Sequence, residues 1–196
     1  MARPDLTEVR TPQILDAFAR CVARYGLEGA SLEQIAEEAG MKRSILRHYV
    51  GNREDLVVAL AGRVVERYRE DLEELMSALP GAGAKRVEAL LDYLFTTERW
   101  EPSVENVVAD TLLSAVDRYP EVGEIMKGFM EELFEVYEGL LRDGYPKAER
   151  AKVKAVAYGV VSLSFTHEWM MPMGMPAGYG RSAKGAAKVL VGSLAT

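Results

Sequence analysis

Four basic residues stand close together in the first third of this 196-residue sequence, and no acidic residue lies among them. They are Lys42, Arg43, Arg47 and Arg53, which give the stretch 42–53 a local charge of +4 in a chain whose net charge is −6. Lysine and arginine can neutralise phosphates, and each neutralised phosphate releases counterions from nucleic acid. The chemistry that this cluster indicates is therefore binding to nucleic acid.

The sequence around the cluster predicts two short helices joined by a tight turn. Ser31 and Gln34 have the spacing of a capping box, in which each side chain satisfies a free backbone N–H of the other residue. The helix that begins there is expected to stop at Gly40, and a further short helix is expected over 42–50. This is the layout of a helix-turn-helix motif over about 31–50, whose second helix enters the major groove of DNA.

Helical geometry separates core positions from DNA-facing positions on the helix 42–50. At about 100° per residue, Ile45, Leu46 and Tyr49 are expected to include the inward stripe. Arginine can pair with two acceptors of guanine, so Arg43 and Arg47 are the first candidates for base recognition. Contacts to phosphates are expected from other residues of the motif and its flanks. The complete set of candidate DNA contacts is Ser31, Lys42, Arg43, Ser44, Arg47, His48, Tyr49 and Arg53.

Apolar residues recur at helical spacing along almost the whole chain, which predicts an all-α fold with an N-terminal three-helix domain followed by a helical bundle. Thr11 and Pro12 are typical of a helix start, and Gly26 is typical of a left-handed helix end. The segment 80–84 is the clearest linker in the sequence. The expected helices outside the motif are 12–25, about 56–79, 85–100, 104–116, 121–142, 147–171 and 182–194.

The run 31–56 resembles the DNA-binding signature of the TetR family of transcriptional regulators. The matching residues are Ala36, Gly40, Leu46, His48, Tyr49, Asn52, Glu54, Asp55 and Leu56. The run departs from the family pattern at Arg47, where tyrosine is usual, at Val50, where phenylalanine is common, and at Arg53, where lysine is usual.

The resemblance implies a helix-turn-helix DNA-binding domain over 8–55 and a ligand-binding and dimerisation domain over 56–196. It implies a homodimer formed through about 147–171 and 182–194, a palindromic operator in double-stranded DNA, and release by a small-molecule effector. Repression is the more common mode of regulation in the family. Small residues in the last two helices, such as Ala155 and Gly159, would allow helices to approach closely.

An effector site would draw on the larger side chains of the second domain, because ligand cavities are mostly apolar with a few polar groups. The same side chains build ordinary cores, so a plain core role stays open for each of them. The candidate pocket residues are Tyr93, Trp100, Tyr119, Phe129, Met130, Tyr137, Phe165 and Trp169.

No cofactor or metal is expected. The single Cys21 and two histidines do not form a zinc cluster, and the methionines near Met173 favour packing over a copper(I) site. His167 and Glu168 are about 100° apart on a helix, which does not favour a catalytic pair. The sequence shows neither a signal peptide nor a membrane span, so we expect a cytoplasmic protein.

Two other classes of function stay open at this point. A small helical enzyme would need a nucleophile with its base, a metal cluster or a phosphate-binding loop, and the sequence offers none of them. A module that uses the same layout to bind a protein partner would lack salt-dependent DNA binding.

Overall fold

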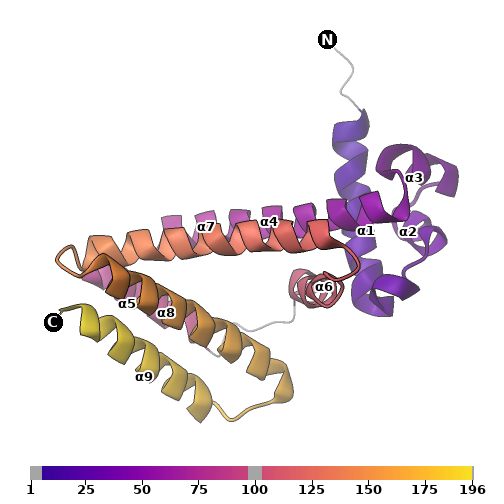
Figure 1. The fold of residues 1–196 in the computed structure, drawn as a ribbon. Coiled ribbons are helices and arrows are strands. Elements are labelled where there is room, and N and C mark those ends of the chain that lie inside the picture. The colour runs from indigo at the N-terminus through magenta and orange to yellow at the C-terminus, as the bar shows by residue number, and fades with distance from the viewer. Residues whose placement is uncertain (1–5, 97–102, 196) are drawn as a thin grey trace. The chain divides into compact units, whose positions relative to one another are not determined.

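The computed structural model describes residues 6–96 and 103–195, and within these ranges every regular element is a helix (Figure 1). The all-α expectation is therefore confirmed. The elements are α1 (Leu6–Gly29), α2 (Leu32–Glu38), α3 (Arg43–Val50), α4 (Arg53–Ala78), α5 (Ala84–Leu94), α6 (Val104–Leu113), α7 (Pro120–Gly144), α8 (Arg150–Met170), a 3₁₀ turn η1 (Met171–Met173), α9 (Gly178–Gly192) and a 3₁₀ turn η2 (Ser193–Ala195).

The predicted start of the first helix is wrong. The helix begins at Leu6, so Pro12 lies inside it and removes one backbone hydrogen bond from the helix. The predicted break at Gly26 is present, with φ of 72°. Its ψ of 169° lies outside the left-handed helical region, so the chain kinks there and α1 resumes as far as Gly29.

The chain divides into two compact units. Unit 1 comprises Met1–Leu72 and Pro102–Phe129, and unit 2 comprises Glu73–Glu101 and Met130–Thr196. Helices α4 and α7 contribute residues to both units. The boundary between residues 55 and 56 that the sequence indicates separates a DNA-binding domain from a ligand-binding and dimerisation domain. This functional boundary stays a prediction.

The core of unit 1 forms around the apolar stripe of α1. Ile14, Phe18 and Val22 on this stripe are at most 1% exposed, and they pack with Leu46 of α3 and Leu56 of α4. Burial of such side chains is the main source of stability for so small a unit. Helix α6 packs against α1 and closes the same core. The short α3 is therefore held on a rigid support.

In unit 2, α8 and α9 lie side by side (Figure 1). A Cβ atom added at Gly159 of α8 would lie 2.7 Å from Cδ1 of Leu190 of α9. Gly159 therefore leaves space for the Leu190 side chain where the two helices meet, as expected for small residues in this segment. None of the described helices is long and apolar enough to cross a membrane.

Candidate nucleic-acid interface

The predicted capping box begins α2. Ser31 Oγ accepts a hydrogen bond from the Gln34 backbone N–H at 3.2 Å, and Gln34 Oε1 accepts one from the Ser31 N–H at 2.8 Å. After α2, Gly40 has φ of 64°, which an L side chain rarely adopts. The N–H of Met41 then bonds to the Ala36 carbonyl at 2.8 Å and closes the turn into α3. The helix-turn-helix motif is thus present with the predicted caps.

Helix α3 is anchored by one side chain and exposes its first residues. Leu46 is 0% exposed, whereas Lys42, Arg43 and Ser44 are exposed at the start of the helix. Lys42 is the N-cap residue, and its side chain makes no capping hydrogen bond. The N-terminal part of a recognition helix is the part that contacts base edges. Three of the predicted DNA-contacting residues are therefore presented on an accessible surface.

Ile45 departs from the prediction. The sequence predicts that it faces inward with Leu46, but it is 43% exposed, whereas Tyr49 is partly buried against the core. Ile45 precedes Leu46 by about 100° on the helix, so it falls at the edge of the buried face. An exposed aliphatic side chain beside the basic residues can contact a thymine methyl group, and the sequence pattern did not single it out for this.

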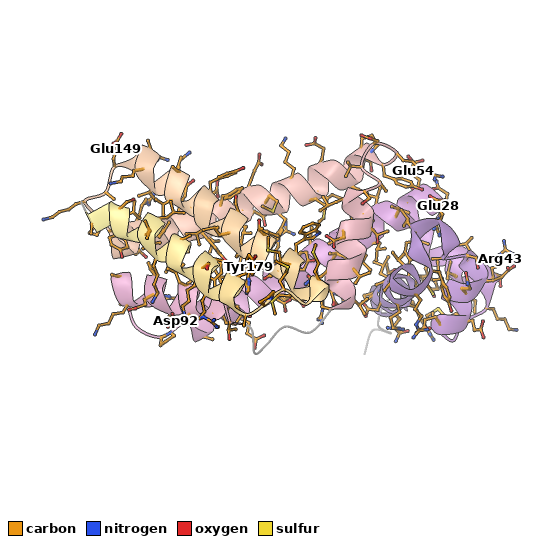
Figure 2. The ribbon with its side chains drawn as sticks, turned by 90° about the horizontal axis from the view of Figure 1, so that it is seen from below. Glu28, Arg43, Glu54, Asp92, Glu149 and Tyr179 are labelled. Carbon is orange, nitrogen blue, oxygen red and sulfur yellow. The ribbon has the colours of Figure 1, made fainter. Side chains whose placement is uncertain are left out.

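Arg43 is paired with a carboxylate of the preceding helix. Its Nη1 donates to Oε1 of Glu33 on the first turn of α2, at 2.6 Å. Both side chains remain accessible, at 54% exposed for Arg43 and 72% for Glu33. Figure 2 places Arg43 at the outer edge of unit 1. The first candidate for base recognition thus takes part in an ion pair.

Arg53 occupies a different environment from Arg43. Its guanidinium donates to the carbonyl of Ala30 at 2.6 Å and to the carbonyl of Leu27, and it lies over the ring of Phe18. These contacts tie the start of α4 to the end of α1. The predicted phosphate contact by Arg53 would have to be made by a side chain that already has these internal partners.

The turn between α3 and α4 is defined by a second cap. Asn52 Oδ1 accepts from the N–H groups of Glu54 and Asp55, at 2.7 and 3.0 Å, and Asp55 Oδ2 accepts from the Asn52 N–H at 3.0 Å. Gly51 has φ of 68°, and a Cβ there would lie 2.5 Å from Asp55 Oδ2. This turn therefore requires glycine at position 51.

The remaining predicted DNA contacts are placed less fully. Ser31 is exposed, although its hydroxyl already serves as the cap of α2. Arg47 and His48 lie in α3, but their side chains are outside the described residues, and their roles stay predictions.

The predicted pocket residues fall in different parts of the molecule. Tyr119 and Phe129 belong to the core of unit 1, where they are 5% and 7% exposed. In unit 2, Tyr137 is buried, Met130 is half-buried, and the other described candidates are exposed. Those exposed candidates are Tyr93, Phe165 and Trp169. Trp100 lies outside the described residues.

Unit 2 buries two titratable side chains whose neutral forms are favoured. Burial raises the pKa of Tyr137, and the nearby charges of Glu168 and Tyr93 raise it further. Burial lowers the pKa of His167, which is 6% exposed and whose ring centroid lies 5.7 Å from that of Phe95. Its Nε2 is buried without a hydrogen-bond partner among the described residues. Both side chains are therefore uncharged at neutral pH.

Unit 1 contains an open cavity of about 470 Å³ between the end of α1 and the end of α6. Glu28 and Arg118, which form an ion pair, both line it. None of the predicted pocket residues does so. Among the described residues, no group of three or more His, Cys, Asp or Glu side chains is arranged to hold a metal ion.

Comparison with known proteins places the motif in a family. The family model described as "Bacterial regulatory proteins, tetR family" matches residues 14–60, from α1 into α4. The chain is 30% identical over 115 residues to the HTH-type transcriptional regulator BetI of Vibrio campbellii, covering 58% of this chain and 56% of that protein. It is 26% identical over 159 residues to the HTH-type transcriptional repressor AcnR of Corynebacterium diphtheriae, covering 70% and 79%.

The chain spans about half the length of the BetI proteins that it matches. The fold is similar over a longer stretch. A TetR transcription regulator from Haloarcula marismortui superimposes with a TM-score of 0.74 at 15% identity, covering 95% of this chain and 98% of that one. The multidrug binding protein EbrR, solved with imidazole, superimposes with a TM-score of 0.60 at 18% identity, covering 96% of each chain. At these identities the likeness concerns the fold.

Proposed function

Because this chain belongs to the tetR family of bacterial regulatory proteins, we propose that it regulates transcription by binding double-stranded operator DNA through α2 and α3. The observation that carries the proposal is the start of α3, where Lys42, Arg43 and Ser44 are exposed while Leu46 holds the helix in the core. Arg43 and Arg47 contact base edges, and Ser31, His48, Tyr49 and Arg53 position the phosphate backbone.

The regulator acts as a homodimer, with its contact surface in the segments 147–171 and 182–194. Three exposed aromatic residues on α8 support this assignment. Tyr158, Phe165 and Trp169 are 64%, 46% and 64% exposed, and their spacing of seven and four residues puts them on one helix face. On α9, Val189 is 76% exposed. A second copy of the chain would cover this apolar surface and present two copies of α3 to a palindrome, about 34–36 Å apart.

A small-molecule effector binds in the second domain and releases the DNA, so that the protein is a ligand-responsive repressor. The name of AcnR and the imidazole complex of EbrR support this assignment by analogy. Helix α4 contributes residues to both units and is the element that would carry the signal. The effector must bind the released form better than the DNA-bound form, since only a difference in affinity shifts the equilibrium.

The test is selection from a pool of random duplex DNA, with the affinity for selected sequences followed against salt concentration. The proposal predicts enrichment of a palindrome and a steep loss of affinity as salt rises. An R43A/K42A double variant should lose this enrichment, because it removes two exposed cations without touching the core. Weak, salt-insensitive binding of the intact protein, with no enriched sequence, would reject the proposal in favour of a protein-interaction module.

The dimer is tested by sedimentation at micromolar concentration. Val189→Glu should shift the protein towards monomer, because a carboxylate would be buried in the proposed contact. The control is Leu113→Glu, at a residue of α6 that is 49% exposed and outside the proposed contact surface. Equal sedimentation of the two variants as dimers would contradict the assignment of this surface.

A further inference from the structure

We propose that Glu33 is a specificity-determining residue of the DNA-binding surface, which restrains Arg43 so that the guanidinium favours guanine over the phosphate backbone. The inference rests on the proposed DNA-binding function and extends it to an acidic residue. Glu33 lies on α2 and Arg43 is the first residue of α3, and their side chains meet across the turn of the motif.

The geometry leaves part of the guanidinium free. The ion pair joins Arg43 Nη1 to Glu33 Oε1 at 2.6 Å. A guanidinium carries five N–H donors in a fixed plane, so one contact to a carboxylate leaves donors for another acceptor. Guanine offers two acceptors, O6 and N7, on its major-groove edge. Arg43 can therefore contact guanine while Glu33 fixes the direction of its side chain.

Contact with a phosphate is different. On DNA without guanine at the right position, the strongest acceptor for Arg43 is a backbone phosphate, and the proposal requires that the side chain leave Glu33 to reach it. The carboxylate of Glu33, 72% exposed, then stands unpaired near a polyanion. The ion pair and this repulsion both weaken binding to random DNA, each by a factor of at most about five for exposed charges.

The experiment compares Glu33→Gln with Glu37→Gln in the intact chain. Glu37 is exposed on the same short helix, and it takes part in none of the ion pairs among the described residues. Both substitutions remove one negative charge from α2, so the general gain in attraction to DNA is common to them. Only Glu33→Gln removes the restraint on Arg43.

The quantity to measure is the ratio of affinities for the selected operator and for random duplex DNA at fixed salt. For Glu33→Gln we expect tighter binding to random DNA and a ratio lower by about two- to fivefold. Glu37→Gln should leave the ratio unchanged. In an Arg43→Gln background, Glu33→Gln should also leave the ratio unchanged, because the residue through which Glu33 acts is gone.

Glu33 also stabilises the start of α2, since a carboxylate in the first turn interacts favourably with the helix dipole. That stabilising role would change the free energy of unfolding and leave the affinity ratio unchanged. Urea unfolding of each variant therefore separates the stabilising role of Glu33 from its effect on Arg43. If Glu33→Gln and Glu37→Gln change the ratio equally, the inference is overturned while the DNA-binding function stands. If the unaltered protein binds no DNA, the DNA-binding function and the inference about Glu33 are both rejected.

Discussion

The guanidinium carbon of Arg53 lies 5.0 Å from the centre of the Phe18 ring, so the first residue of α4 lies over a fully buried residue of α1. The same guanidinium donates to the carbonyls of Leu27 and Ala30 at the end of α1. These carbonyls lie where the helix no longer supplies partners from within itself. Arg53 thus holds together two of the helices that support α3.

Arg53→Lys should therefore lower the free energy of unfolding although it keeps the positive charge. An ammonium group cannot make the planar contact with Phe18 and both carbonyl hydrogen bonds together, and we expect a loss of about 1–3 kcal/mol in urea unfolding. The control Arg67→Lys, at an exposed position of α4 paired only with Glu70 among the described residues, should change stability by less than about 0.5 kcal/mol. Unchanged stability of Arg53→Lys with weaker DNA binding would show that Arg53 acts through phosphate contact alone and does not hold the two helices together.

Substitution by alanine should destabilise the protein at Gly51 and stabilise it at Gly62. Gly51 has φ of 68° and no room for a Cβ beside Asp55, so Gly51→Ala should destabilise the protein by at least about 1–2 kcal/mol. Gly62 lies within α4, where a Cβ would meet no atom within 4 Å, and alanine favours a helix interior by about 0.5–1 kcal/mol. Thermal and urea unfolding of the two variants show whether each substitution lowers or raises the stability of the protein. A stabilised Gly51→Ala would contradict the described turn.

Ile45→Ala should alter the operator sequence that the protein prefers. The exposed side chain stands beside Arg43 and Ser44, where it can contact a thymine methyl group, and its loss should weaken the preference for thymine at one position in each half-site. Selection from random duplex DNA with both proteins shows the change. The control is Leu113→Ala, an exposed apolar residue of α6, which should leave the preference as it is. Equal base preferences for Ile45→Ala and the unaltered protein would exclude this contact.

His167→Phe should reduce the sensitivity of the fold to acid. The pKa of His167 is lowered in the folded protein, so the unfolded chain binds its proton first as the pH falls below the ordinary value of 6.5. Its contribution to stability is present above that pH and is lost as the pH falls towards the lowered folded value. Phenylalanine cannot take up a proton, and it also removes the unpartnered Nε2.

The measurement for His167 is urea unfolding between pH 7.5 and pH 5. The unaltered protein should lose more stability over this range than His167→Phe does, and the two should differ least at pH 7.5. The variant His48→Gln controls for loss of the other histidine. Parallel pH profiles for His167→Phe and the unaltered protein would show that His167 does not titrate differently in the folded and unfolded states.

Features that depend on neighbours along the chain could be predicted from the sequence. The capping box of Ser31 and Gln34, the break after α4 and the buried stripe through Phe18 all arise from residues a few positions apart. Caps and helical periodicity act within one or two turns, so they can be recognised without knowledge of the fold. The basic cluster and its helix-turn-helix setting belong to the same class of local signals.

Features that depend on packing between distant segments were decided only by the tertiary structure. Arg53 finds its partners 23 and 26 residues away, Glu33 meets Arg43 across a turn, and Ile45 stays exposed because no other helix covers that edge of α3 in the described part of the chain. Tyr119 and Phe129 joined the core of unit 1 for the same reason. Residue types and their spacing identify the apolar face of a helix. Which other element packs against that face depends on how the whole chain folds.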